Sequence, residues 1–518
     1  MTQAAAVPRD ATIAVIGSGA MGSGIAQIAA QAGHAVRLFD TRMGAAEKAR
    51  SAIGQTLETL AQKGRLNAAD AAASAARIVA VHALGDCVSA ALVIEAIVED
   101  LAEKRALLRE LEKIVPAQTI LATNTSSLSV TALAAGLRHP GRFAGMHFFN
   151  PVPLMKLVEI VAGLATDRAT TDTLAATAIA WGKEPVHATS TPGFIVNRCA
   201  RPFYGEALRL LSERAADAAT IDAVLRSAGG FRMGPFELMD LIGNDVNFAV
   251  TRGVWEACYH DPRYAPSVQQ NELVAAGFLG RKSGRGFHDY AADAPPPQPA
   301  TLDAQTFDGA IALHGDAGTL APLVARLVAA GVDVQQRPAL AAFPDGALAA
   351  ADAVLALSDG RTATSRAGAT GTPNLVLVDL ARDYSTCERL ALAASDRCAA
   401  DAFNAAAGLL QRAGVAVSRF DDVAGLAVLR IVATLANEAA DAVTHGVASA
   451  ADVDVAMQKG VNYPCGPLRW ADDVGVGRIR DVLHNLAAHY GEDRYRLSPL
   501  IARRFATGEP LAADARQR

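Results

Sequence analysis

The 518-residue sequence contains little cysteine, few aromatic residues and no marked excess of charge. Its six cysteines form no CxxC pair, which excludes a disulfide framework and leaves no metal site to predict. A net charge of -5 argues against a nucleic-acid or anionic-membrane partner. The opening MTQAAAVPRD lacks the basic start, apolar run and cleavage site expected of a signal peptide, and no uninterrupted apolar run approaches the ~20 residues that span a bilayer. We therefore expect a cytoplasmic protein with reduced thiols.

The first part of the sequence alternates short β-branched runs with alanine-rich segments of helical periodicity. Four strands are expected, in the runs TIAVIG, AVRLFD, ALVIEAIV and TILATN. This alternation predicts an α/β domain with a mostly parallel sheet and helices on both faces. From about residue 190 the pattern becomes helical. There Thr191-Pro192-Gly193 predicts a helix start, with a hydroxyl cap and a proline at the first position.

The turn after the first predicted strand contains the pattern GSGAMG, residues Gly17 to Gly22. Glycine here permits a tight turn and lets the backbone approach a pyrophosphate, whose charge the helix N-terminus attracts. The next strand ends in Asp40, about 20 residues on, where a carboxylate binds the adenosine ribose and repels a 2′-phosphate. The combination predicts a Rossmann domain that binds NAD rather than NADP, although Arg42 follows closely. The alternative is a glycine-rich turn without a ligand.

A proline-rich segment and an internal repeat divide the rest of the chain. Four prolines between Pro295 and Pro299 favour an extended linker. Beyond it, a shift of 232 residues superimposes the first helical segment on a second one without a gap, as at Gly193 and Gly425. The segment in between resembles a degenerate α/β unit, in which IALHGDAG stands in place of IAVIGSGAMG. The predicted domains are an NAD-binding Rossmann domain (1–190), a helical domain (191–290), a linker (291–306), a degenerate Rossmann-like segment (307–420) and a second helical copy (421–518).

A second candidate site is the segment RFAGMHFFNPVPLMKLVEIV, in which two strand-like runs flank the turn from Asn150 to Pro153. If the runs pair antiparallel, the midpoint between His147 and Glu159 falls inside the turn, so the two side chains face each other. A carboxylate beside an imidazole fixes its tautomer and stabilises the imidazolium, and the other ring nitrogen then serves as a general base. The alternative is a core histidine beside an unrelated surface glutamate.

These motifs closely resemble those of the 3-hydroxyacyl-CoA dehydrogenase family. The resemblance covers about residues 10–290 and rests on HFFNP, MKLVEI, TNTSSLS, TPGFIVNR and MGPFELMDLIG, which follow the GSGAMGSGIA turn. It implies that His147 removes the proton of a 3-hydroxyl group while hydride leaves C3 for NAD, with Glu159 as its orienting partner. It also implies that Ser126 and Asn197 bind the substrate oxygens and that Lys63 contacts coenzyme A. The dinucleotide contacts implied by the turn and the family are Gly17, Gly19, Ala20, Met21, Gly22, Asp40, Glu99, Lys104, Asn150 and Lys282.

Several of these residues have an alternative role on the sequence alone. Ser126 follows a strand at the carboxyl edge of the sheet, where ligands of such folds bind, but its hydroxyl is equally suited to cap the helix predicted from SLSVTALAAGL. Asn197, one turn into an apolar helix, needs a polar partner, for which water or backbone would also serve. Lys63 lies in a basic segment that suits coenzyme A phosphates but also an ordinary solvated face. The arginines considered as partners of a distal substrate carboxylate are Arg201, Arg226, Arg232 and Arg252.

The second copy departs from the family pattern at its chemistry-bearing positions. Asn197 becomes Leu429, the glycine pattern becomes Gly315-Asp316-Ala317-Gly318, and no His–Glu pair around an NP turn recurs after residue 300. We therefore expect this half to lack activity. Because the helical domain is the dimer contact in smaller family members, we expect residues 421–518 to pack on 191–290 as a partner subunit would, in an intrachain pseudo-dimer or a homodimer. Such long forms resemble the dehydrogenases of phenylacetate catabolism, whose 3-hydroxyacyl-CoA substrate carries a second carboxylate.

The sequence thus predicts NAD-dependent oxidation of (3S)-3-hydroxyacyl-CoA to 3-oxoacyl-CoA, with 3-hydroxyadipyl-CoA or 3-hydroxybutyryl-CoA as the candidate substrate. A related dehydrogenase of free hydroxy acids or sugar acids has the same two-domain plan and is the main alternative. A crystallin-like relative that binds NAD without catalysis is expected to lose the base, yet His147 and Glu159 are present. A bifunctional hydratase–dehydrogenase needs a crotonase-like domain, which neither half supplies.

Overall fold

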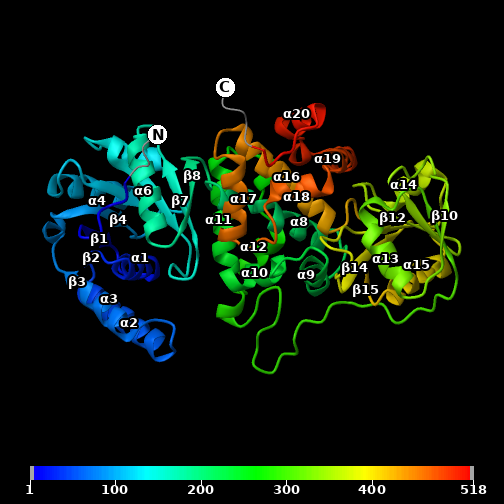
Figure 1. The fold of residues 1–518 in the computed structure, drawn as a ribbon, viewed down its shortest axis with the longest axis horizontal. Coiled ribbons are helices and arrows are strands. Elements are labelled where there is room, and N and C mark those ends of the chain that lie inside the picture. Colours follow the sequence, from blue (N-terminus) through cyan, green and yellow to red (C-terminus); the bar gives the residue numbers. More distant parts are fainter. Residues whose placement is uncertain (1–4, 514–518) are drawn as a thin grey trace. The chain divides into compact units, whose positions relative to one another are not determined.

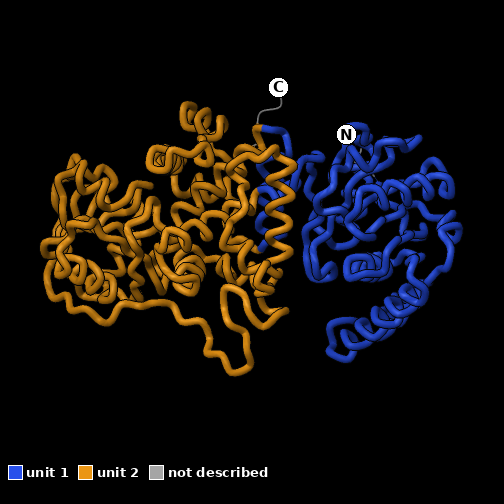
Figure 2. The backbone as a smooth tube through the Cα atoms, turned by 180° about the vertical axis from the view of Figure 1, so that it is seen from behind, with its two compact units in different colours: residues 1–198, 445–461, 515–518 blue, residues 199–444, 462–514 orange. Residues whose placement is uncertain are grey.

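The structure is a computed structural model that describes residues 5–513. It divides into two compact units, which are coloured separately in Figure 2. Within the described residues, the first unit comprises residues 5–198 and 445–461, and the second comprises residues 199–444 and 462–513. The first unit therefore combines the predicted α/β domain with a short piece of the second helical copy.

The first unit contains an eight-stranded sheet in the order β3-β2-β1-β4-β5-β6-β7-β8. Neighbouring strands are parallel except β6 and β7, which pair antiparallel. The strands are β1 (Thr12–Ile16), β2 (Ala35–Phe39), β3 (Ile78–Val81), β4 (Ala90–Glu95), β5 (Ile120–Thr123), β6 (Phe143–Phe148), β7 (Leu157–Ala162) and β8 (Glu184–Thr189). The sheet confirms the predicted α/β fold. Two of its strands were not predicted: β3, a short strand that continues directly from a helix, and β8 at the other edge of the sheet.

Helices pack on both faces of this sheet. On one face, α1 and α6 bury apolar residues against Met146 and Phe148 of β6 and Ile160 of β7. On the other face, Val130 of α5 lies against Gly145 of β6. In Figure 1, α2 and α3 form a helical hairpin that extends away from the sheet. The helices are α1 (Ala20–Gln31), α2 (Ala45–Gln62), α3 (Ala68–Arg77), α4 (Leu101–Ile114), α5 (Val130–Ala134), α6 (Arg168–Ala180), α7 (Val196–Cys199) and α17 (Ala450–Gly460).

The second unit contains a smaller sheet of seven strands in the order β10-β9-β11-β12-β13-β14-β15. Its strands are β9 (Ile311–His314), β10 (Val334–Arg337), β11 (Ala347–Ala350), β12 (Ala353–Leu357), β13 (Leu375–Val378), β14 (Arg389–Ala394) and β15 (Ala416–Arg419). Its helices are α13 (Ala321–Ala329), α14 (Ala363–Thr370) and α15 (Ala400–Arg412). β11 and β12 form an antiparallel hairpin, whereas β4 and β5 of the first sheet are parallel strands joined through α4. The second α/β half is therefore a reduced version of the first.

The remainder of the second unit is helical and contains parts of both helical copies. The first copy supplies α8 (Arg201–Ser212), α9 (Ala218–Ser227), α10 (Pro235–Ile242), α11 (Asn244–Ala257) and α12 (Val268–Ala275). The second copy supplies α16 (Val428–Thr444), α18 (Pro467–Val474), α19 (Val476–Tyr490) and α20 (Pro499–Thr507). The two copies touch within this unit, because α8 packs on α16 and the fully buried Arg430 donates hydrogen bonds to Glu206 (2.7 Å) and Glu213 (3.0 Å).

The 232-residue repeat extends further toward the N-terminus than the sequence identities indicate. After the shift, α6 coincides with α15 and β7 with β14. The antiparallel pair of β6 and β7 has its counterpart in β13 and β14. In this register His147 corresponds to Asp379, and Glu159 corresponds to Ala391. The second half therefore retains the strand pair and lacks both residues of the His–Glu pair.

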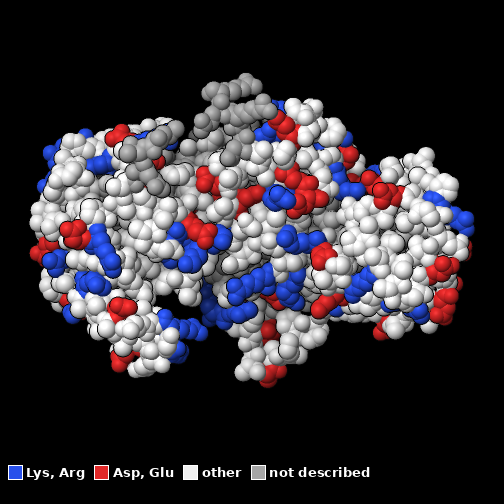
Figure 3. All heavy atoms as spheres, in the orientation of Figure 1, with Lys and Arg blue, Asp and Glu red and all other residues white. Residues whose placement is uncertain are grey.

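The surface carries charges of both signs, and one long connecting segment is irregular. Over residues 5–513, no helix is both long and apolar enough to cross a membrane. On the face drawn in Figure 3, Lys and Arg gather near the lower middle of the view, and charges of both signs are mixed elsewhere. No helix or strand occurs from residue 291 to residue 310, the segment that contains the predicted linker.

Candidate active site

His147 and Glu159 lie opposite each other on the antiparallel strands β6 and β7, as their spacing about the turn predicts. His147 Nδ1 and Glu159 Oε2 are 2.6 Å apart, and the two residues are 5% and 0% exposed. The rings of Phe149 and Phe194 flank the imidazole, with centroids 4.5 and 5.9 Å away. A buried carboxylate that accepts the hydrogen of Nδ1 fixes the ring tautomer. Nε2 makes no hydrogen bond to any residue in the described range.

The other oxygen of Glu159 holds the start of α7. Glu159 Oε1 accepts hydrogen bonds from the N–H groups of Ile195 (2.9 Å) and Val196 (3.0 Å). N–H groups at a helix start lack partners inside the helix, so a carboxylate is stabilised there. The predicted helix start at Thr191-Pro192-Gly193 is therefore wrong. Gly193 and Phe194 have left-handed φ values of 74° and 46°, because the chain turns sharply to bring these N–H groups onto Glu159, and the helix begins at Val196.

Ser126 and Asn197 come together although they are 71 residues apart in the sequence. Asn197 Nδ2 donates to the carbonyl oxygen of Ser126 at 3.4 Å. Asn197 is the second residue of α7, so its predicted place one turn into a helix is wrong for the same reason as the helix start. Ser129, and not Ser126, caps α5 by accepting the N–H of Ala132 at 3.1 Å. The Ser126 hydroxyl is thus not used as a cap, and substrate binding by both residues stays a prediction.

Glu99 binds the loop that carries Ser126. Its Oε1 accepts hydrogen bonds from Thr125 Oγ1 (2.6 Å) and from the N–H groups of Ser126 (2.9 Å) and Ser127 (3.1 Å). Burial acts to raise the pKa of Glu99, but the hydrogen bond from Thr125 and the charge of Lys104 outweigh it and hold this pKa below its usual range. Glu99 is therefore ionised, and it fixes the backbone of the loop at the carboxyl edge of the sheet.

Lys104 is buried beneath this loop and is 1% exposed. Its Nζ lies 2.5 Å from Glu95 Oε1 and 3.3 Å from Glu99 Oε2. Glu95 also accepts a hydrogen bond from Thr123 Oγ1 at 2.7 Å. The structure thus places Lys104 in an ion-pair network, and its implied contact with the dinucleotide stays a prediction. Glu95 and Thr125 were not among the predicted site residues, although polar side chains at the ends of parallel strands gather at one edge of the sheet.

The glycine turn between β1 and α1 fits a pyrophosphate group. A Cβ on Gly17 would lie 2.4 Å from Ala96 O, and a Cβ on Gly22 would lie 1.8 Å from Gly17 O, so both positions require glycine. A Cβ on Gly19 would meet no atom within 4 Å. Gly19 is also the N-cap of α1 and makes no side-chain cap hydrogen bond. Open space beside the uncapped start of a helix suits a phosphate, whose oxygens accept the N–H groups there.

Asp40 follows β2 and points back to the glycine turn. It accepts hydrogen bonds from Ser18 N (2.8 Å), Ser18 Oγ (2.7 Å) and Arg42 Nε (3.1 Å). Partial burial acts to raise the pKa of Asp40, but the hydrogen bonds from Arg42 and Ser18 outweigh it and hold this pKa well below its usual range. An ionised carboxylate here is suited to accept hydrogen bonds from ribose hydroxyls and to repel a 2′-phosphate. Arg42 is bound to Asp40, which limits its attraction for that phosphate.

Three predicted contact residues take no part in the hydrogen bonds and ion pairs described above. Asn150 is exposed at the turn between β6 and β7, and Lys63 is exposed at the end of α2. Lys282 belongs to the second unit, where its Nζ lies 2.6 Å from Asp245 Oδ1. Their contacts with the cofactor or with coenzyme A stay predictions. Among the residues that the structure describes, no group of His, Cys, Asp or Glu side chains is arranged to hold a metal ion.

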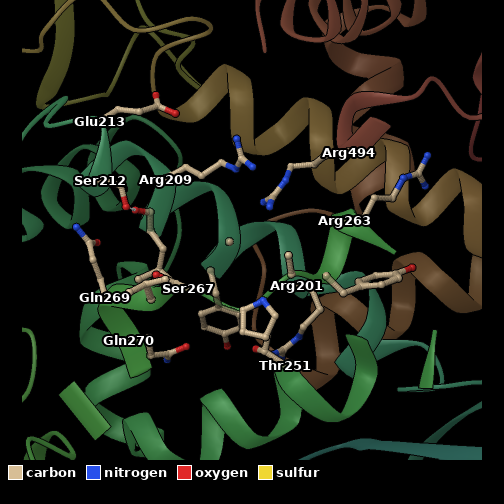
Figure 4. A pocket seen from close by; sticks show the side chains of 17 residues that line it. Arg201, Arg209, Ser212, Glu213, Thr251, Arg263, Ser267, Gln269, Gln270 and Arg494 are labelled. Carbon is tan, nitrogen blue, oxygen red and sulfur yellow. Dashed lines mark hydrogen bonds between the residues drawn. The ribbon is translucent and has the colours of Figure 1, made fainter. Parts of the chain in front are cut away.

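A separate cavity in the second unit is rich in arginine (Figure 4). It is lined in part by Arg201, one of the arginines considered for a substrate carboxylate, which is 5% exposed and donates to Thr251 Oγ1 at 2.8 Å. The other arginines around the cavity each have a carboxylate partner. These pairs are Arg209 with Glu492 (2.6 Å), Arg263 with Asp441, and Arg494 with Glu206 (3.6 Å). The pairs join residues of the two helical copies, so the cavity belongs to the packing between those copies.

Comparison with known proteins decides the family. Residues 12–191 match the 3-hydroxyacyl-CoA dehydrogenase NAD binding domain, and residues 193–290 and 425–516 both match the 3-hydroxyacyl-CoA dehydrogenase C-terminal domain. The chain belongs to the 3-hydroxyacyl-CoA dehydrogenase family. Residues 355–423 match the 3-hydroxybutyryl-CoA dehydrogenase reduced Rossmann-fold domain, in agreement with the smaller second sheet.

Relatives of this 3-hydroxyacyl-CoA dehydrogenase include proteins that match almost the whole chain and shorter proteins that match only its first half. The 3-hydroxyadipyl-CoA dehydrogenase of Escherichia coli is 42% identical over 493 residues, which cover 95% of this chain and 97% of the relative. A crystal structure of 3-hydroxybutyryl-CoA dehydrogenase from E. coli K12 matches with a TM-score of 0.87 and 40% identity, covering 96% of this chain and 98% of that one. The human mitochondrial hydroxyacyl-coenzyme A dehydrogenase is 40% identical over 290 residues, 54% of this chain and 90% of its own. The protein is therefore a long-form 3-hydroxyacyl-CoA dehydrogenase, an oxidoreductase with an NAD-binding domain.

Proposed function

We propose that this dehydrogenase oxidises (3S)-3-hydroxyacyl-CoA to 3-oxoacyl-CoA with His147 as the general base and Glu159 as its partner. The observation that carries the proposal is the buried hydrogen bond of 2.6 Å between His147 Nδ1 and Glu159 Oε2. This bond directs the second ring nitrogen away from Glu159 and leaves it for a substrate. The glycine turn, Asp40 and the Ser126 loop all follow strand ends of the same sheet, where ligands of such folds bind.

In this mechanism each group of the protein has a defined role. His147 Nε2 takes the proton of the 3-hydroxyl group, and Glu159 stabilises the imidazolium that forms. Glu159 keeps its position because its other oxygen is held by the N–H groups of Ile195 and Val196. Bound NAD supplies the acceptor for the hydride that leaves C3. Ser126 and Asn197 bind the substrate oxygens and thereby orient C3.

We propose a dicarboxylic thioester, 3-hydroxyadipyl-CoA, as the preferred substrate, with 3-hydroxybutyryl-CoA as the second candidate. The first is supported by the name of the E. coli relative that aligns over 95% of this chain, and the second by the name of the matching crystal structure. The distal carboxylate of an adipyl chain requires a cationic or hydrogen-bonding partner. Of the arginines considered, Arg226 pairs with Glu237 and Arg252 with Glu256 (3.5 Å), which makes these two less suitable.

The test is a steady-state comparison of 3-hydroxyadipyl-CoA, 3-hydroxybutyryl-CoA and free 3-hydroxybutyrate, each with NAD and with NADP. We expect oxidation of both thioesters with NAD, with the higher kcat/KM for the adipyl compound. His147→Gln is expected to lower kcat by ~10²–10⁴-fold while the Kd for NADH stays within about twofold. Full activity in His147→Gln would remove the base assignment, and faster turnover of the free acid would support the alternative dehydrogenase.

A further inference from the structure

One helix of the second copy is part of the catalytic unit. Helix α17 belongs to the second helical copy by sequence, yet it packs on β7 and β8 of the first sheet, and Figure 2 shows it with the first unit. The chain before α17 is also attached there, because Thr189 N donates to Val447 O at 2.9 Å and Thr189 Oγ1 donates to Gly446 O at 3.2 Å. Lys459 and Glu184 form an ion pair of 3.3 Å at the surface.

The arrangement is reciprocal. Helix α9, which α17 matches in the 232-residue register, packs on β14 of the second sheet. There the N–H of Arg382 donates to Ala228 O at 2.8 Å, and the N–H of Glu388 donates to Ser227 Oγ at 3.0 Å. Each sheet is therefore covered by a helix from the other copy. The catalytic sheet lacks this helix unless the second copy is present.

Helix α17 comes close to the catalytic unit at Gly460, the last residue of the helix. A Cβ on Gly460 would lie 2.7 Å from Leu157 Cδ2 and 3.0 Å from Val196 Cγ2. Leu157 is two residues before Glu159 on β7, so their side chains share one face of the sheet. Val196 donates its N–H to Glu159 at 3.0 Å. Gly460 thus touches both elements that hold the carboxylate of the His–Glu pair.

We propose that α17, through Gly460, is a positioning element for Glu159 and hence for His147; this inference rests on the proposed roles of that pair. Close-packed interiors transmit small displacements, because side chains there have little free volume. A shift of β7 or α7 moves the carboxylate, and the imidazole loses the orientation that proton transfer needs. The appended half, which lacks its own His–Glu pair, therefore contributes to catalysis by completing the first half.

The experiment uses the full chain and the variant Gly460→Val. Valine inserts three carbon atoms against Leu157 and Val196, and such overpacking forces neighbouring elements apart. We expect kcat with 3-hydroxybutyryl-CoA to fall by about tenfold or more, since a misplacement of about 1 Å costs up to ~10²-fold in rate. The Kd for NADH, which reports the glycine turn and Asp40, should stay within about twofold.

A compensating change tests the contact itself. Leu157→Ala removes Leu157 Cδ2, the nearest atom that a side chain at position 460 would meet, so the double variant Gly460→Val/Leu157→Ala should recover much of the lost kcat. Gly460→Ala is the milder companion variant in case valine prevents folding. It adds one carbon and improves intrinsic helix propensity, so a loss of kcat in Gly460→Ala would not follow from a weaker helix.

Two control variants separate positioning from general damage. Ala228→Val enlarges the position that matches Gly460 in the register, at the C-cap of α9, the helix that covers the second sheet; it should lower Tm and leave kcat within about twofold. Lys459→Ala removes the neighbouring ion pair, whose side chains are 44% and 43% exposed, and should change neither kcat nor Tm measurably.

The outcomes are distinct. The proposal is overturned if Gly460→Val and Gly460→Ala both keep full kcat, if Ala228→Val loses as much kcat as Gly460→Val, or if Leu157→Ala gives no rescue. Loss of NADH binding together with kcat would also overturn it, because the whole domain would then be disturbed. Full activity of His147→Gln would instead refute the proposed base, whatever the Gly460 variants do.

Discussion

The two α/β halves of the chain share one register, yet they place a carboxylate on different strands. In the first half Glu159 of β7 accepts the N–H groups of Ile195 and Val196. In the second half the matching N–H groups, of Ala427 and Val428, donate instead to Asp379, which follows β13 and occupies the position of His147. Ala391, at the position of Glu159, carries no polar group.

The difference separates two tasks that Glu159 combines. Both halves keep a buried carboxylate at the start of the helical segment, where unpaired N–H groups require an acceptor. Only the first half has an imidazole beside that carboxylate. Anchoring the helix is therefore a structural requirement of the fold, and orienting the imidazole is an additional task of the catalytic half.

The two glycine turns differ in a similar way. In the first half Gly19 offers open space and an uncapped helix start. In the second half Asp316 Oδ1 accepts the N–H of Gly318 at 2.9 Å, so a negative charge stands where a phosphate would have to bind. A Cβ on Gly346 would also lie 2.0 Å from Asp316 O, which shows how closely another loop covers this turn. The second turn is unsuited to a dinucleotide.

The largest expected contrast is between Glu159→Ala and Asp379→Ala. Glu159→Ala removes both the partner of His147 and the helix anchor, and kcat should fall by ~10²–10⁴-fold. Asp379→Ala leaves buried N–H groups without an acceptor, so it should lower stability by about 1–3 kcal/mol or more but change kcat of the folded enzyme less than about twofold. Steady-state rates and urea unfolding of both variants measure the contrast. Equal losses of kcat would mean that the two carboxylates have the same task.

A smaller contrast concerns NAD. Asp40→Ala should weaken NADH binding by about 10- to 100-fold, since hydrogen bonds to a charged group contribute ~1.5–3 kcal/mol. Asp316→Ala, at the turn of the second half, should leave the Kd unchanged. Isothermal titration should also give one NADH per chain. A second equivalent of NADH that persists in Asp40→Ala would show that the reduced half binds the cofactor.

The sequence predicts features that depend on neighbouring residues well. It fails for features that depend on contacts between distant residues, as the predicted site residues illustrate. The glycine turn, Asp40 and the pairing of His147 with Glu159 follow from spacing within one or two neighbouring elements, and the structure has each of them. The start of α7 was predicted wrongly because the local signal Thr-Pro-Gly is overridden by Glu159, a residue more than 30 positions away. The ion pairs of Lys104 with Glu95 and Glu99 were not predicted, and its contact with the dinucleotide stays a prediction.

The position of α17 illustrates a different limit. The repeat identities establish that α9 and α17 are equivalent in sequence, but equivalence does not reveal which sheet each helix covers. That choice depends on contacts such as Gly460 with Leu157, which are formed between segments about 300 residues apart. No pattern in either segment alone carries this information, because each apolar face would be satisfied by either sheet.

The smallest expected effect is a pH dependence of the free energy of unfolding that arises from Asp379 in the second half. Burial raises the pKa of Asp379 to about 6, although the N–H groups of Val428, Leu429 and Ala427 act to lower it. Because this folded-state pKa lies above the unfolded value of about 3.9, the stabilising contribution is full below pH ~4 and is lost as pH rises through about 6. From pH 7 to pH 5 the native protein should therefore gain about 1 kcal/mol relative to Asp379→Asn, measured by urea unfolding at both pH values. Asp383→Asn, at an exposed position with a lowered pKa, is the control: it keeps Asp379, so the native protein should show no such gain relative to it. If the stability of Asp379→Asn changes with pH as that of the native protein does, Asp379 does not change its protonation state between pH 5 and pH 7. The raised pKa assigned to Asp379 would then be wrong.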